Sequence, residues 1–143
     1  MYCSTHLVGG ATAALAARNP AIAFVLGLTS HALLDMVPHH DYGKVGPGLI
    51  DVAVGIILLL AIRSFGIGPQ VVWGALGGVL PDLEVVWAYF HPASYALPHG
   101  YKKLIFPSHN GLLLQRSLQL PWGFLIQCCI IVAGFLILRA FQT

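Results

Sequence analysis

The sequence predicts an all-α protein, a polytopic membrane bundle of about five helices in one domain covering residues 1–143. Hydrophobic residues make up 57% of the chain, and Asp, Glu, Lys and Arg together only 8%, against roughly 25% in an ordinary soluble domain. The mean hydropathy is +0.81. Several apolar segments approach the roughly 20 residues that cross a hydrocarbon core. Helices are expected because a chain in lipid must satisfy its backbone hydrogen bonds internally.

The expected helices follow in chain order, with prolines at most of their boundaries, as suits a residue that disfavours helix interiors. A short first segment at about 5–17 is expected to be a helix, or else to be re-entrant or partly interfacial. Four longer apolar segments approach spanning length, at 20–37, 48–65, 69–90 and 121–141.

Two further features concern packing and loops. Gly74 and Gly78 are four residues apart, a spacing that allows close helix approach in lipid. The segment 91–120 is expected to be a loop because it holds three prolines and many polar residues. Its end, 108–120, can form a short interfacial helix capped by Ser108.

Composition excludes several classes. The formal charge is +2 and Lys102-Lys103 is the only basic pair, so no nucleic-acid partner is expected. Cys3, Cys128 and Cys129 suit neither a disulfide framework nor a CxxC metal site. The N-terminus lacks a basic region, so no cleavable signal peptide is expected.

The titratable residues are concentrated on one side of the predicted bundle. If every helix crosses the membrane, the acidic residues and histidines all fall on the side of the N-terminus, here called the N-terminal face. Ionisable residues at membrane depth are costly and are functional by default. The opposite half holds only Arg18, Arg63 and Arg139. The candidates at the N-terminal face are His6, His31, Asp35, Asp51, Asp82, Glu84 and His109.

His31 and Asp35 are four residues apart and therefore share one helical face. An imidazole and a carboxylate at this spacing can bind one metal ion or two adjacent ions. Such ligands suit a divalent metal, zinc first, with manganese or iron as alternatives. A cation would also neutralise carboxylates at membrane depth.

Several positions carry a second interpretation. Asp51 can cap the third helix, and Asp82 can cap a helix broken at Pro81. Asp82 and Glu84 face apart on a regular helix, so only one should point inward, and Asp82 is favoured. His39 and His40 fit an exposed loop and a supporting role behind the ligands equally well. Plain loop positions are expected for His91 and His99.

Four segments together resemble the small membrane-bound metal-dependent hydrolase family of bacteria. They are "THLVGG" at 5–10, "SHALLDMVPHHDYG" at 30–43, "GGVLPDLE" at 77–84 and "SHNGLLLQ" at 108–115. The His-x-x-x-Asp element also resembles the zinc-dependent phospholipase C superfamily. Many members of the membrane family pair Pro-Asp with Asp-His and a following His-Arg, where this chain has Leu83-Glu84-Val85.

The resemblance implies a bacterial inner-membrane protein and assigns its site residues. The implied metal and active-site residues are His6, His31, Asp35, Asp82 and His109, with Asp51 as a further candidate. Asp82 or Asp51 would be a ligand, a bridge between two ions, or the base that accepts a proton from water. Glu84 and the ligand count stay open because of the departure at 83–85.

The expected function is a metal-dependent hydrolase near the membrane surface, acting on a phospholipid or lipid-linked phosphoester. A metal-ion or proton transporter is an alternative, although the opposite half lacks the polar groups of a path. Two further alternatives are a haem protein and a non-catalytic protein whose helices are held together by a bound metal. The N-terminal face holds four Lys or Arg residues and the opposite face three, so the count favours a cytoplasmic N-terminal face only slightly. The oligomeric state stays open.

Overall fold

A computed structural model describes residues 1–42, 45–91 and 104–142 of the protein. Within these residues the protein is all-α, with five α-helices and one 3-10 turn, which confirms the predicted fold class. Each helix begins and ends within a few residues of its predicted bounds. The elements are α1 (Cys3–Ala13), η1 (Ala14–Ala16), α2 (Pro20–Asp35), α3 (Val45–Ser64), α4 (Gln70–Phe90) and α6 (Trp122–Ala140).

Three helices are long and apolar enough to cross a membrane, namely α3 over Gly46–Ser64, α4 and α6. α2 has 16 residues, two fewer than the predicted 20–37, and it is a shorter apolar helix than these three. Its start is fixed because the Asn19 side chain accepts a hydrogen bond from the backbone N–H of Ile22 at 2.9 Å. Its end at Asp35 precedes Pro38, which cannot continue a helix.

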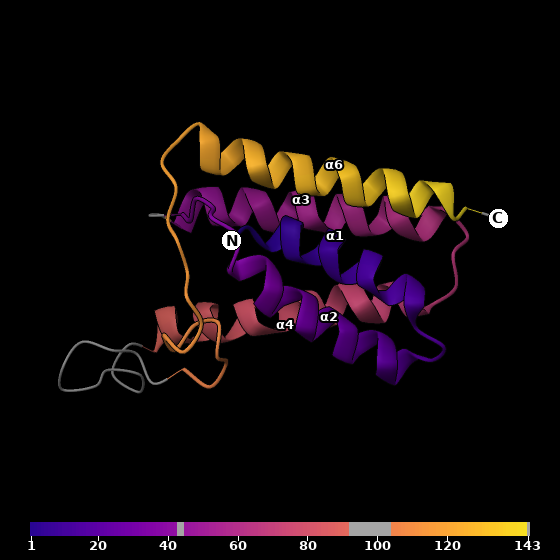
Figure 1. Ribbon diagram of the computed structural model, residues 1–143, viewed down its shortest axis with the longest axis horizontal. Coiled ribbons are helices and arrows are strands. Elements are labelled where there is room, and N and C mark those ends of the chain that lie inside the picture. Colours follow the sequence, from indigo (N-terminus) through magenta and orange to yellow (C-terminus); the bar gives the residue numbers. More distant parts are fainter. Residues whose placement is uncertain (43–44, 92–103, 143) are drawn as a thin grey trace.

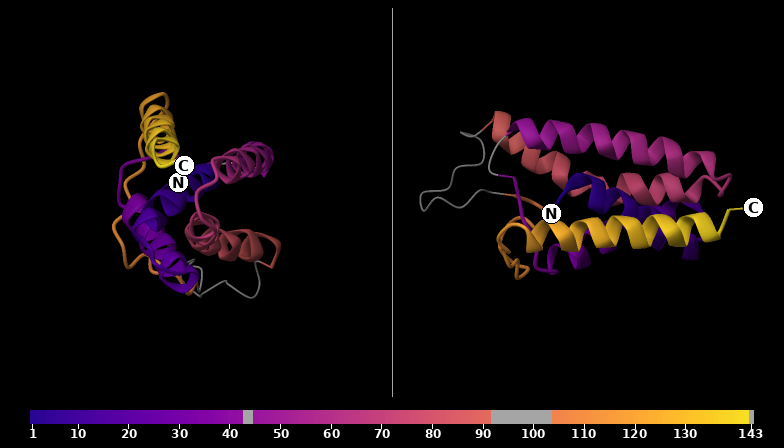
Figure 2. Two further views of the ribbon diagram at one scale, coloured as in Figure 1. Left: turned by 90° about the vertical axis from the view of Figure 1, so that its right-hand side faces the viewer. Right: turned by 90° about the horizontal axis from the view of Figure 1, so that it is seen from above.

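The short helix α1 lies at the centre of the bundle. It contacts all four other helices, and Figures 1 and 2 show it enclosed between α3, α6, α2 and α4. Most of its residues are therefore buried, on every side of the helix. Large apolar side chains of α3 and α6 are exposed instead, as expected of helices that face lipid.

Glycines bring α1, α2 and α4 into backbone contact. A Cβ added at Gly78 would lie 2.3 Å from the carbonyl oxygen of His6, and one added at Gly74 would lie 2.4 Å from that of Gly10. A Cβ at Gly27 of α2 would lie 2.1 Å from the carbonyl oxygen of Gly74. Real Cβ atoms do not approach so closely, so the close approach predicted from the spacing of Gly74 and Gly78 is confirmed.

The described end of the loop, residues 104–121, contains turns and no helix. The predicted interfacial helix at 108–120 is therefore wrong. Gly111 adopts a φ of +89°, which a right-handed helix excludes. The Asn110 side chain accepts a hydrogen bond from the N–H of Leu112 at 3.0 Å, a local bond that competes with helix formation. Residue 91 is also non-helical, and residues 92–103 lie outside the described part.

Candidate metal centre

Two helices deliver three buried side chains to one point. His6 comes from the start of α1, and His31 and Asp35 come from the last turns of α2; all three are fully buried. His6 Nε2 lies 3.0 Å from Asp35 Oδ1. The rings of His6 and His31 stack with centroids 3.7 Å apart. The glycine contacts between α1, α2 and α4 make this possible because they leave no side chains between the backbones.

His109 and Asp82 complete the group from other elements. The loop after residue 104 brings the His109 ring edge-on to that of His31, with centroids 5.2 Å apart. Its Nε2 atom lies 3.7 Å from Asp82 Oδ1 on α4. His109 and Asp82 are half-buried, with side chains 10% and 19% exposed. The centre is therefore closed on the side of α1 and partly open beside α4 and the loop.

Three donor atoms form a nearly regular triangle. The separations are 3.1 Å from His31 Nε2 to Asp35 Oδ2, 3.3 Å from His31 Nε2 to His109 Nε2, and 3.4 Å from His109 Nε2 to Asp35 Oδ2. Ligands at about 2.0–2.1 Å from a tetrahedral zinc ion are separated by about 3.3 Å. The three atoms are therefore spaced as one face of a zinc-sized coordination tetrahedron. Below, they are called the donor triangle.

The backbone of α4 fixes the tautomer of His31. Its Nδ1 atom lies 2.6 Å from the carbonyl oxygen of Gly78. A carbonyl oxygen only accepts, so Nδ1 carries the proton and the lone pair of neutral His31 is on Nε2, within the triangle. Such a carbonyl behind a histidine is the usual second interaction of a metal-ligating imidazole.

The polar atoms of the centre are incompletely satisfied among the described residues. Asp35 Oδ2 lies within the triangle but has no partner in hydrogen-bond geometry, and Asp82 Oδ2 is also unpaired. The Nδ1 atoms of His6 and His109 are buried without partners as well. Unpaired buried carboxylate oxygens are strongly unfavourable. A bound cation would remove that cost at Asp35, so the donor set fits a divalent metal.

A cationic group already lies beside the centre. The amino group of Met1 is 3.3 Å from Asp35 Oδ1 and 2.7 Å from Asp41 Oδ1. Burial lowers the pKa of this amino group, but the two carboxylates outweigh burial and leave its pKa raised. Burial likewise raises the pKa of Asp41, but His39 and the amino group outweigh it and hold that pKa well below its usual range. Positive charge is thus stabilised on this side of Asp35.

Asp51 is buried but lies outside the donor triangle. Its carboxylate accepts hydrogen bonds from the backbone N–H of Ser4, at 3.2 Å, and from the Ser4 hydroxyl. It therefore caps the first turn of α1 from a neighbouring helix, where the positive end of the helix dipole favours an acid. Among the described residues, two groups have donor atoms close enough to share a metal, His6-His31-Asp35 and His31-Asp82-His109, and Asp51 belongs to neither.

Glu84 holds the loop that carries His109. Its two carboxylate oxygens accept the backbone N–H groups of Ile105, at 2.5 Å, and Phe106, at 3.1 Å. His109 follows three residues after Phe106. Glu84 therefore supports the site through the backbone.

The remaining histidines are His39, His40, His91 and His99. His39 is 1% exposed, and its backbone exchanges hydrogen bonds with the end of the loop at 116–118. It therefore supports the loop without joining the triangle. His40 is half-buried and its carbonyl accepts from the Gln127 side chain at 2.9 Å. His91 is exposed and stacks on Trp87. His99 lies outside the described residues.

Gln127 is a structural residue that sequence reasoning missed. It is fully buried in α6, and its amide also accepts from the N–H of Tyr2 at 2.7 Å. It therefore ties the start of the chain and the loop at His40 to α6. Its signal in the sequence was present, because it is the single polar side chain in the interior of an otherwise apolar helix.

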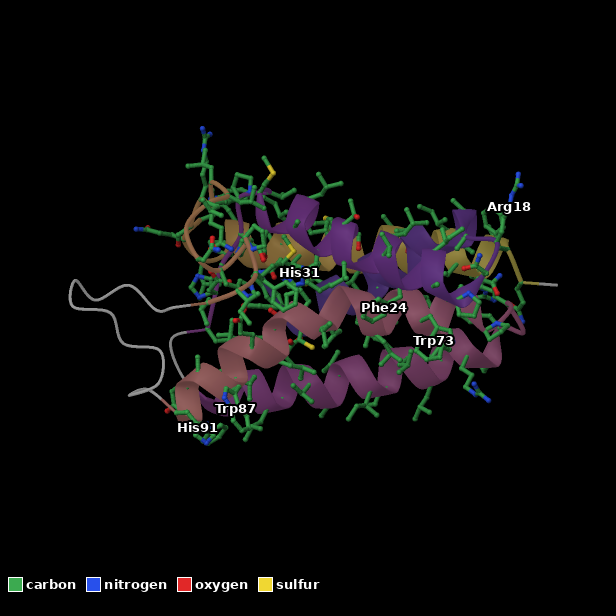
Figure 3. The ribbon with its side chains drawn as sticks, turned by 90° about the horizontal axis from the view of Figure 1, so that it is seen from below. Arg18, Phe24, His31, Trp73, Trp87 and His91 are labelled. Atoms are coloured by element: carbon green, nitrogen blue, oxygen red, sulfur yellow. The ribbon has the colours of Figure 1, made fainter. Side chains whose placement is uncertain are left out.

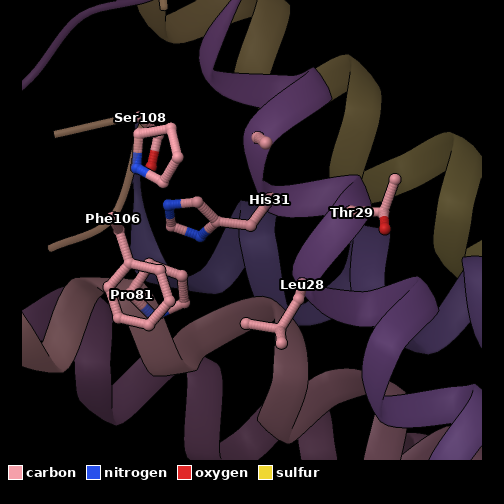
Figure 4. Close-up of a pocket in the computed structure, with 8 residues that line it drawn as sticks. Leu28, Thr29, His31, Pro81, Phe106 and Ser108 are labelled. Carbon is pink, nitrogen blue, oxygen red and sulfur yellow. The ribbon is translucent and has the colours of Figure 1, made fainter. Parts of the chain in front are cut away.

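A groove of about 270 Å³ lies against His31 (Figure 4). The ring of His31 points toward Ser108, Phe106 and Pro81, with Leu28 deeper along the same helix. Most of the lining is apolar. Its residues are Leu28, Thr29, His31, Ala32, Pro81, Phe106, Pro107 and Ser108.

Comparison with protein-family models, curated proteins and solved structures found no match for this chain.

Proposed function

We propose that this protein is a metal-dependent hydrolase embedded in the membrane, acting on an ester close to the membrane surface. The observation that carries the proposal is the donor triangle, in which two imidazoles and one carboxylate are spaced for a zinc-sized ion. Catalytic zinc sites have three protein ligands and an open position. The partial exposure of His109 and Asp82 supports such an opening here.

Each residue then has a role. His31, Asp35 and His109 hold the metal, with manganese or iron as alternatives to zinc. His6 hydrogen-bonds to the far oxygen of Asp35 and fixes that carboxylate. The bound metal supplies Lewis acidity and an activated water. Asp82, beside His109, would take a proton from an attacking water and return it to the ester oxygen as that oxygen leaves the phosphoryl or acyl centre.

The same proposal includes the cellular setting that the sequence suggests. The protein would be a multi-pass protein of a bacterial inner membrane, and its substrate a phospholipid or lipid-linked phosphoester. His31 lies one turn before the end of α2, and Figure 3 shows it toward the end of the bundle opposite Arg18. That level suits an ester near the headgroups.

Metal content measured by mass spectrometry on detergent-purified protein tests the proposal. Wild type should carry about one equivalent of zinc or manganese. His31→Ala and Asp35→Ala should lose it, and Asp82→Asn should retain it while losing hydrolysis. His91→Ala is the control because His91 is exposed and stacks on Trp87. A wild type that stays metal-free after zinc addition would contradict the proposal.

A further inference from the structure

The groove against His31 runs from the centre along α2 toward Leu28. Ala32 and Leu28 are one turn apart on α2, and they line it below His31. One helical turn is about 5.4 Å, so the floor of the groove lies deeper in the membrane than the donor triangle. Pro81 of α4 forms the facing wall, and Phe106 lies over the His31 end (Figure 4).

The chemistry of the groove selects an apolar ligand. Leu28, Ala32, Pro81 and Phe106 present only carbon atoms. The Thr29 hydroxyl donates to the carbonyl of Val25 at 2.9 Å, so its proton is already committed within the helix. A polar peptide or a sugar in the groove would find few partners for its own groups. The ring edge of His31 and the hydroxyl of Ser108 remain as polar groups, at the end nearest the centre.

The size and direction of the groove fit one alkyl chain. Its volume of about 270 Å³ is at or below the lower end of pockets for whole small molecules, roughly 300–1,000 Å³, so it suits part of a larger ligand. A bilayer lipid has its ester bonds near the surface and its chains directed inward. A chain in the groove would take the same direction, with its ester at the level of His31 and His109.

We propose that the groove holds one acyl chain of a membrane lipid and directs the ester of that lipid to the donor triangle. This inference rests on the proposed function, because only a hydrolase would act on the ester that the groove places at the donor triangle. It names a lipid with an acyl chain as the substrate class. Binding of the chain itself requires no metal, because the groove walls are protein carbon atoms.

Photolabelling in vesicles tests the inference. The probe is a phosphatidylcholine with a photoreactive diazirine a few carbons from the ester on one acyl chain, diluted in unlabelled phosphatidylcholine. In the wild-type protein, residues 28–32 and 104–108 should be labelled more strongly than the lipid-facing side of α3. Ala32→Trp fills the groove, and groove labelling should fall about tenfold, since excluding roughly two methylenes costs that factor.

Matched variants and a metal measurement separate the outcomes. Ala53→Trp places the same side chain on an exposed position of α3 and should leave groove labelling unchanged. Leu28→Trp fills the groove one turn farther from the centre and should repeat the loss if Ala32→Trp fails to fold. Three results would each overturn the inference. Groove labelling could equal that of α3, it could be unaffected by both groove variants, or the groove could cross-link to a protein segment that occupies it in place of a lipid. Metal content is read on the same samples: a metal-free wild type with specific groove labelling refutes only the hydrolase proposal.

Discussion

Gly78 is the position where a single methyl group should disturb the centre most. Its Cβ in a Gly78→Ala variant would lie 2.3 Å from the carbonyl oxygen of His6, where ordinary contact begins at 3.4 Å. The atom it meets is backbone, so α1 and α4 must separate by about 1 Å. Inserting a methylene into a packed interior costs about 1–3 kcal/mol. The same shift moves the Gly78 carbonyl that orients His31.

Gly55→Ala is the matched control in a helix interior. Its Cβ would lie 3.6 Å from Leu7 Cδ1, an ordinary contact. Alanine gains about 0.5–1 kcal/mol over glycine within a helix at either position, so the difference between the two variants reports the clash. The free energy of unfolding, measured in mixed micelles, should be lower for Gly78→Ala by about 2 kcal/mol. Its metal affinity should fall about 10–100-fold, as for other losses of supporting contacts.

Equal unfolding free energies and equal metal affinities for the two variants would refute this reasoning. They would mean that α1 and α4 are not in backbone contact at Gly78. The positions of His6 and His31 relative to each other would then need another explanation.

Two other carboxylates should separate structural support from metal binding. Asp51→Asn should lower the free energy of unfolding by about 1–3 kcal/mol, because it removes the charge that accepts two hydrogen bonds from Ser4. Its metal content should equal that of wild type, and a loss of metal in well-folded protein would contradict the structural role. Glu84→Gln should weaken metal affinity about tenfold through the loop that carries His109. In a His109→Ala background the same change should have no further effect, and a full effect there would show that Glu84 acts by another route.

The sequence could predict the helices and the side of the bundle on which the chemistry lies. Hydrophobic length and prolines mark the helices, and a chain that crosses a membrane repeatedly returns its helix ends alternately to one face. His31 and Asp35 could be paired because a separation of four residues is one helical turn. The structure brings His6, Asp82 and His109 to the same pair. Metal binding by these residues stays a prediction.

The sequence could not predict which group of another helix or loop each carboxylate contacts. Asp51 and Glu84 were candidates for chemistry because a carboxylate at membrane depth is unusual, whichever group it contacts. Their observed partners include the backbone N–H groups of Ser4, Ile105 and Phe106, which every residue except proline offers. Only the tertiary packing distinguishes a carboxylate that holds backbone from one that faces a metal.

The protonation of the donor triangle gives the strongest physical reason to expect a cation there. His31 has its proton on Nδ1, bound to Gly78, so the neutral ring presents a lone pair to Asp35 Oδ2 at 3.1 Å. The neighbouring His109 can carry a proton on Nε2, which replaces the repulsion between two lone pairs along one edge of the triangle with a hydrogen bond. It cannot relieve all three edges, because one proton lies along one edge at a time. In a site without a metal, a further proton on His31 or Asp35 would be needed at a second edge. A divalent cation accepts all three lone pairs at once, and the separations of 3.1–3.4 Å are the ones it would require.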